Sequence, residues 1–123
     1  MITGNGRKLV VVESPFAGAT EDIIKRNLKY ARACMRDCLQ RGELPFASHL
    51  LYTQEGILDD NIPRERALGI EAGLAWGQHA ELTVVYRDLG TTRGMQEGIQ
   101  RAKREKRAIE YRNLPIELLQ TIL

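Results

Sequence analysis

A polar, glycine-bearing segment follows an apolar run in the second half of the chain. Residues 87–94 read RDLGTTRG and come directly after LTVVY. Such a turn offers glycines that let a ligand approach the backbone, two threonine hydroxyls, the cation of Arg93 and the unpaired amides of a helix start. These groups suit phosphate or ribose. The segment fits neither G-x-G-x-x-G nor G-x-x-x-x-G-K-[ST], so the sequence does not favour hydride transfer or nucleoside triphosphate hydrolysis.

A carboxylate, Glu97, follows this turn in the first turns of the expected helix. At the edge of a ligand crevice it could act as nucleophile at a sugar carbon, or steady a positively charged sugar in the transition state. It could equally be a charge that stabilises the positive end of the helix dipole. The residues alone leave both interpretations open.

Apolar runs predict the strands that must position these groups. KLVVVE at 8–13 and LTVVY at 82–86 are continuous β-branched runs, typical of strands covered on both faces. Shorter strands are expected at 44–47 and 108–111. The stretch from 48 to 61 contains turn formers without a clear period and is expected to be an ordered loop.

Helix signals alternate with these runs. Thr20 is a good N-cap for a long helix that Gly42 ends, and Pro63 can open a second helix that reaches about Gln78. A third helix follows Gly94, and Pro115 opens a last short one. Gly69, Gly73 and Gly77 share one face of the second helix, so the sheet, a second copy of the chain or a ligand must approach that face closely.

This order predicts an α/β domain spanning residues 1–123. We expect a three-layer α/β/α arrangement of the flavodoxin or Rossmann-like kind, with a mostly parallel sheet of four to five strands. In such folds ligands bind at the carboxyl ends of the strands. There the chain carries ESPFAG after the first strand and RDLGTTRGMQE after the third strong one, so both loops are expected to face one crevice.

Composition narrows the function classes. The chain has 123 residues, 43% hydrophobic and 28% charged, with a formal charge of +2. That charge is too mild to require a nucleic-acid partner, and the basic tract at 101–107 is interpreted as a solvated helix face. No apolar run reaches the roughly 20 residues of a membrane span, and Met1 to Gly6 lack the apolar core of a signal peptide. A cytoplasmic protein with reduced Cys34 and Cys38 is expected.

The sequence predicts neither a metal ion nor a cofactor. The possible metal ligands are two distant histidines, two cysteines without spaced partners and one pair of adjacent aspartates, namely His49, His79, Cys34, Cys38, Asp59 and Asp60.

Two motifs match a known superfamily. VVVESPFAG at 10–18 and VVYRDLGTTRGMQEGIQRA at 84–102 resemble the first loop and the D-x-G…G-M-x-E-G turn of the nucleoside 2-deoxyribosyltransferase and nucleotide N-glycosidase superfamily. The segment FASHLLYTQEGILDD resembles a branch of small relatives encoded by phages and bacteria. The resemblance implies an enzyme that acts on a nucleoside or nucleotide. It also implies a homodimer or a higher homo-oligomer, because members often share a pocket between subunits.

The resemblance also implies residue roles. Glu97 is the expected nucleophile that attacks C1′ and releases the base, and Glu71 lies near an acidic position on the helix before the third strand. His49 could contact a phosphate or base and Tyr52 could stack on a base, although both could be structural. The implied substrate-binding positions are, in the first loop, Ser14, Pro15 and Phe16 and, in the second, Asp88, Gly90, Thr91, Thr92, Arg93, Gly94 and Met95.

Two functions from different classes follow. One is cleavage or transfer at the N-glycosidic bond of a nucleoside or nucleoside 5′-monophosphate. The other is capture of a nucleotide, such as a signalling nucleotide, without turnover, in which Glu97 only hydrogen-bonds the ribose. The cationic and amide donors favour a phosphorylated ligand in both cases.

Overall fold

A four-stranded parallel sheet forms the centre of the protein in the computed structural model, which describes residues 6–123. The strands run in the order β2-β1-β3-β4, with β1 at Leu9–Glu13, β2 at Leu44–Phe46, β3 at Leu82–Tyr86 and β4 at Ala108–Arg112. The predicted α/β class and parallel sheet are confirmed. The interpretation of the N-terminus concerned residues 1–6, of which positions 1–5 lie outside the described residues.

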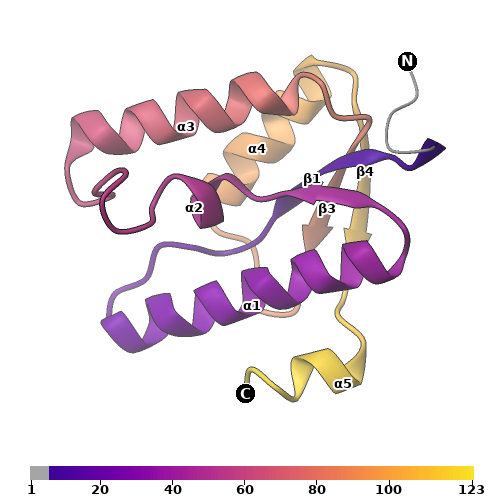
Figure 1. Ribbon diagram of the computed structural model, residues 1–123, viewed down its shortest axis with the longest axis horizontal. Helices are drawn as coiled ribbons and strands as arrows, with labels where there is room; N and C mark the ends of the chain where they lie inside the picture. Colours follow the sequence, from indigo (N-terminus) through magenta and orange to yellow (C-terminus); the bar gives the residue numbers. More distant parts are fainter. Residues whose placement is uncertain (1–5) are drawn as a thin grey trace.

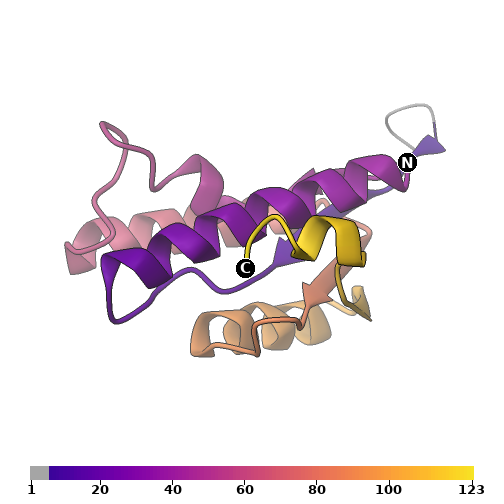
Figure 2. The same ribbon diagram turned by 90° about the horizontal axis from the view of Figure 1, so that it is seen from below.

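Helices cover both faces of this sheet (Figure 1). The helices are α1 at Glu21–Gln40, α2 at Ser48–Leu51, α3 at Pro63–Gly77, α4 at Arg93–Arg104 and α5 at Ile116–Leu119. Figure 1 shows α3 and α4 above the sheet and α1 and α5 below it, and Figure 2 shows α1 and α5 on the near side when the molecule is seen from below. The protein therefore has three layers.

Alternation along the strands divides their side chains between the two faces. Val10 and Val12 of β1 belong to the core cluster with Tyr30 and Cys34 of α1. On the other face, Val85 of β3 packs with residues of α4. Because successive strand side chains point to opposite faces, residues 11 and 13 of β1 point away from α1. This parity decides which residues can reach the side of the sheet that α3 and α4 cover.

Helix α1 begins and ends where the sequence predicts. The side chain of Thr20 accepts a hydrogen bond from the amide of Ile23 at 3.2 Å, and Gly42 adopts a φ of 81° just after the helix, a conformation that favours glycine. Cys34 and Cys38 are free thiols buried in the core. Burial raises the pKa of Cys38 to about 11, so this thiol is protonated and unreactive at neutral pH.

The region before α3 differs from the expected loop. Residues 48–51 form the short helix α2, which packs between α1 and α3. The glycine-lined face of α3 rests on this region. A Cβ at Gly73 would lie 2.6 Å from Cβ of Ser48, and one at Gly77 would lie 3.4 Å from the side chain of Val11. Close packing within the same chain accounts for both glycines.

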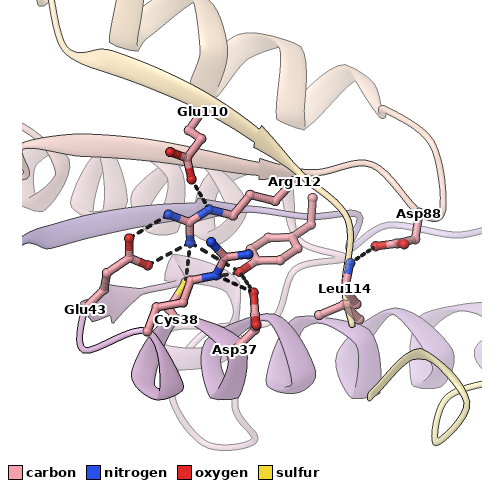
Figure 3. Close-up of polar contacts among 9 residues, drawn as sticks. Asp37, Cys38, Glu43, Asp88, Glu110, Arg112 and Leu114 are labelled. Atoms are coloured by element: carbon pink, nitrogen blue, oxygen red, sulfur yellow. Dashed lines mark hydrogen bonds and ion pairs between the residues drawn. The ribbon is translucent and has the colours of Figure 1, made fainter. Parts of the chain in front are cut away.

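A buried ionic cluster ties the edges of the sheet to α1 (Figure 3). The Arg112 guanidinium donates two hydrogen bonds to the carboxylate of Glu43, at 2.6 and 2.7 Å, and a third to Glu110. The hydroxyl of Tyr86 donates to Asp37 at 2.6 Å. Hydrogen bonds from Arg112 hold the pKa of Glu43 below its usual range. The cluster joins β4 to the residue before β2, across the full width of the sheet.

Removing the cation from this cluster should destabilise the fold strongly. Arg112→Met leaves the largely buried Glu43 without its bidentate partner, and breaking such a pair typically costs roughly 3–5 kcal/mol of unfolding free energy. Arg66→Met is the matched control, because Arg66 and Asp60 form a more exposed pair whose loss should cost about 1 kcal/mol or less. Urea denaturation of both variants measures the difference. Equal losses would contradict a special role for Arg112.

Candidate functional site

A cavity of about 270 Å³ lies between β1, α2, α3 and the first turns of α4. Its floor is the second half of β1, from Val11 to Glu13, together with Ser14 just after the strand. One wall is the face of α3 that carries Gly69, Gly73 and Gly77. The opposite wall runs from Thr92 to Gly98. The cavity therefore sits at the carboxyl end of β1, next to β3. The connections from these two strands leave on opposite sides of the sheet, which is where open parallel sheets bind ligands.

Glu13 is the most perturbed acidic group of the cavity. It is the last residue of β1, and strand alternation turns its side chain toward α4. Burial raises the pKa of its carboxyl to about 8, and the nearby cation of Arg107 opposes that rise without cancelling it. Within residues 6–123, no hydrogen bond or ion pair holds the carboxyl. Glu13 is thus protonated over most of the neutral range and free to act as a proton donor.

Arg107 forms part of the cavity wall from the residue before β4. Its guanidinium donates hydrogen bonds to the hydroxyl of Thr83 at 2.9 Å, to the carbonyl of Gly77 at 2.8 Å and to Glu105 at 2.6 Å. These partners fix its position under the end of α3. The cation therefore acts on Glu13 through space while its own hydrogen bonds go elsewhere.

A serine and a histidine meet beside Glu13. The Oγ of Ser14 lies 3.4 Å from Nε2 of His49, and the ring of Phe16 stacks on the imidazole with centroids 5.3 Å apart. Burial lowers the pKa of His49 to about 4, so the imidazole is neutral at pH 7. A neutral imidazole has one donor and one acceptor, which suits hydrogen bonding to an uncharged ligand better than holding a phosphate.

The start of α4 supplies the polar donors of the cavity. Thr92 caps the helix and accepts a hydrogen bond from the amide of Met95 at 3.3 Å. The other amides of the first turn are donors that every helix leaves without an intrahelical partner, and they carry the positive end of the helix dipole. Arg93 adds a cation whose side chain is 94% exposed. An anionic group at the cavity mouth would meet these donors.

Glu97 lies at the rim of the cavity, not in its depth. Its side chain lines the opening but is 60% exposed, and a carboxylate oxygen lies 3.7 Å from Nε of Arg93. Ion pairs this exposed contribute little energy, so the carboxylate can exchange Arg93 for another partner. Glu13 lines the same cavity from its floor, next to Gly98 of α4.

The structure brings together nine of the residues predicted from the sequence. The cavity is lined from the first loop by Ser14 and Phe16, from the α2 region by His49 and Tyr52, and from the start of α4 by Thr92, Arg93, Gly94, Met95 and Glu97. The remaining predicted positions do not contribute to this lining; they are Pro15, Glu71, Asp88, Gly90 and Thr91.

Local contacts explain two of these differences. Asp88 turns to the α1 side of the sheet, where its carboxylate accepts hydrogen bonds from the hydroxyl of Tyr30 at 2.6 Å and the amide of Leu114 at 2.9 Å (Figure 3 shows the second). Asp88 thus anchors the segment after β4 through its hydrogen bond from Leu114. Glu71 is exposed on α3, two residues from Gly69 and Gly73 and hence on another side of the helix from the cavity wall.

Sequence reasoning missed Glu13, Gly98 and Arg107. A signal for Glu13 was present, because a charged residue ended an otherwise apolar strand at the edge where ligands bind. Gly98 ends the G-M-x-E-G motif, but its role depends on its contact with Glu13 of β1. Arg107 was counted in the basic tract of a solvated helix face, and this was wrong for Arg107, whose side chain is 6% exposed and contacts the end of α3. Within the described part of the chain, no group of three or more histidine, cysteine, aspartate or glutamate side chains could hold a metal ion. Across residues 6–123, no helix combines the length and apolar character needed to cross a membrane.

The fold and the cavity define the class of the protein: a parallel α/β domain with a cavity at the carboxyl ends of its strands, where such domains bind ligands. Residues 8–112 match the model of a protein family described as a domain of unknown function, DUF7768, and the chain belongs to that family. No curated protein matches the chain.

Burial of Glu13 should make the stability of the protein fall with rising pH. The pKa of this carboxyl rises from 4.5 to about 8 on folding, so between these values the folded state holds more protons than the unfolded state. Stability is then lost as pH rises through that window, by up to about 1.4 kcal/mol per pH unit. Glu13→Gln lacks this loss and should gain stability over the wild type from pH 5 to pH 9.

Chemical denaturation of both proteins across that range measures the difference. The depressed pKa of His49 acts in the opposite direction below about pH 6.5, but it is common to both proteins and cancels in the comparison. A difference in unfolding free energy that stays constant from pH 5 to pH 9 would mean that Glu13 titrates normally.

Proposed function

We propose that the protein binds a nucleoside or nucleoside 5′-monophosphate in this cavity and cleaves or exchanges its N-glycosidic bond. Glu97 is the nucleophile at C1′, and either water or a second base is the acceptor. The resemblance of residues 10–18 and 84–102 to the nucleoside 2-deoxyribosyltransferase and nucleotide N-glycosidase superfamily points to this chemistry. The observation that carries the proposal is that Glu13 and Glu97 line one cavity, the first largely buried in its floor and the second exposed at its rim.

Cleavage of a glycosidic bond uses two carboxyl groups in different protonation states. Cleavage through a covalent intermediate uses one ionised carboxylate as nucleophile and one carboxylic acid as proton donor, held in one site. Glu13 is mostly buried and Glu97 is solvated and paired with a cation. A largely buried carboxyl and a solvated one in the same cavity support the roles of proton donor for Glu13 and nucleophile for Glu97.

The rest of the cavity suits a nucleotide. The stacked rings of Phe16 and His49 offer an apolar, aromatic surface for a base. The helix start at Thr92, with Arg93 beside it, offers donors for a 5′-phosphate. An apolar end and a polar, cationic mouth therefore match the two ends of a nucleoside monophosphate.

A second function has one observation in its favour. Glu97 is more than half exposed and is paired with Arg93, which fits a residue that contacts ribose without reacting. In this alternative the protein captures a nucleotide, such as a signalling nucleotide, and releases it unchanged. The two functions differ in turnover, not in the ligand.

Release of free base distinguishes them. The wild type should liberate base from at least one member of a panel of nucleosides and 5′-monophosphates, measured by chromatography. Glu97→Ala should lower that rate by about 10³-fold or more while the ligand still binds, because the variant lacks the nucleophile but keeps the donors of α4. Glu117→Gln on α5, exposed on the opposite face of the sheet, is the matched control and should react like the wild type.

Calorimetric binding of a nucleotide without any base release, unchanged in Glu97→Gln, would favour the binding protein. The absence of both binding and turnover across the panel would exclude both functions.

A further inference from the structure

The carboxyl of Glu13 fills the space that a side chain at position 98 would occupy. A Cβ built on Gly98 would lie 2.1 Å from Oε2 of Glu13 and 2.4 Å from its carboxyl carbon. Gly98 lies inside α4, where glycine is a poor helix former compared with alanine. The helix therefore has a residue of low helix propensity at the position that the carboxyl of Glu13 contacts.

The carboxyl has no structural task that would explain its burial. No hydrogen bond or ion pair satisfies it within residues 6–123, and it faces the cavity. An apolar side chain of similar size would fill the same place without the desolvation cost of an ionisable group. The charged and titratable groups that share the cavity are Asp60, Glu65 and Arg66 before and in α3, Arg93 and Glu97 in α4, and His49, Tyr52 and Arg107.

On the basis of the proposed function, we propose that Glu13 is the general acid of the reaction and protonates the base as it leaves. Its place in the cavity, its lack of partners and its contact with the helix that carries Glu97 assign this role. Glu13 extends from β1 in the floor of the cavity, and Glu97 extends from α4 at the rim of the same cavity.

The reaction balances with these two groups and water. The carboxylate of Glu97 forms a bond to C1′ while the bond from C1′ to the base nitrogen breaks. The electron pair of that bond goes to the base, and the proton of Glu13 passes to the base, which leaves as a neutral molecule. Water then attacks C1′ of the glycosyl ester, Glu97 is released as carboxylate, and the carboxylate of Glu13 takes the proton from water.

The protonation state of Glu13 fits this role. Burial keeps its pKa near 8, so the acid form predominates at neutral pH. A general acid matters only where the leaving group needs a proton. This dependence provides a test that a merely structural role would not satisfy.

The test compares two substrates that differ in the need for a proton. The guanine of guanosine 5′-monophosphate must gain a proton to leave as a neutral base. The base of 7-methylguanosine 5′-monophosphate already carries a positive charge and leaves as a neutral base without one. Glu13→Gln should lower kcat/KM for the first by about 10²–10³-fold and for the second by less than about tenfold. Rates are corrected for uncatalysed loss of the methylated base.

A second readout uses any substrate that the wild type cleaves, whatever its base. The wild-type kcat/KM should fall as pH rises through about 8, and this fall should disappear from the residual activity of Glu13→Gln. Equal losses on both guanine substrates, or an unchanged pH profile, would show that Glu13 is not the acid even though the protein is a glycosidase. A wild type that releases no base from any nucleotide would instead remove the proposed function itself.

A variant at Gly98 tests the geometry independently. Gly98→Ala should push the carboxyl of Glu13 out of place and lower kcat/KM for the unmethylated substrate by about tenfold or more. In a Glu13→Ala background the same change meets no carboxyl, so it should leave the remaining activity unaltered and raise the thermal midpoint of unfolding. Additive effects of the two substitutions on activity would contradict the contact on which the role of Glu13 rests.

Discussion

The parallel pairing of β1 with β3 forms the centre of the sheet and fixes where the candidate site lies. Its register sets Val10 beside Leu82 and Glu13 beside Val85. Because the strands run in the same direction, the loop after β1 and the connection into α4 leave from one edge of the sheet. The outer strands β2 and β4 extend the sheet on either side of this pair. Any shift of this register by one residue would turn Glu13 toward α1 and away from the cavity.

Glu43 and Glu13, on opposite faces of the sheet, differ in their hydrogen bonding. On the α1 face, Arg112 and Glu43 satisfy each other with short, charge-assisted hydrogen bonds, so the cluster supports the fold. On the other face, Glu13 is buried without a hydrogen-bond partner. A buried cluster whose hydrogen bonds are all made supports the fold. A buried carboxyl without a hydrogen-bond partner lowers the free energy of unfolding and can form hydrogen bonds to a ligand. The contrast concerns these two carboxyl groups, because Arg107 on the cavity side has hydrogen-bond partners of its own.

The position of α3 creates the cavity. Its glycines rest against Ser48 of α2 and Val11 of β1, and the helix leaves apolar side chains in solvent, with Trp76 62% and Leu68 51% exposed. A helix packed flat on the sheet would have filled the space above β1. Packing through glycines brings the backbone close at two points and leaves a hollow between them and α4, lined by the second half of β1.

Local sequence signals predict the helices, the strands and the edge of the sheet at which a ligand is expected. The runs at 8–13 and 82–86, the cap at Thr20 and the start at Pro63 are local signals, and alternation of strands and helices implies a parallel sheet whose loops converge. Three features of the site arise only in the folded protein: Glu13 faces α4, Asp88 accepts a hydrogen bond from Tyr30, and Glu97 stays at the rim. These outcomes depend on which helix covers which face and on contacts between residues as far as 85 positions apart, such as Glu13 and Gly98. Local propensity and periodicity carry no information about such contacts.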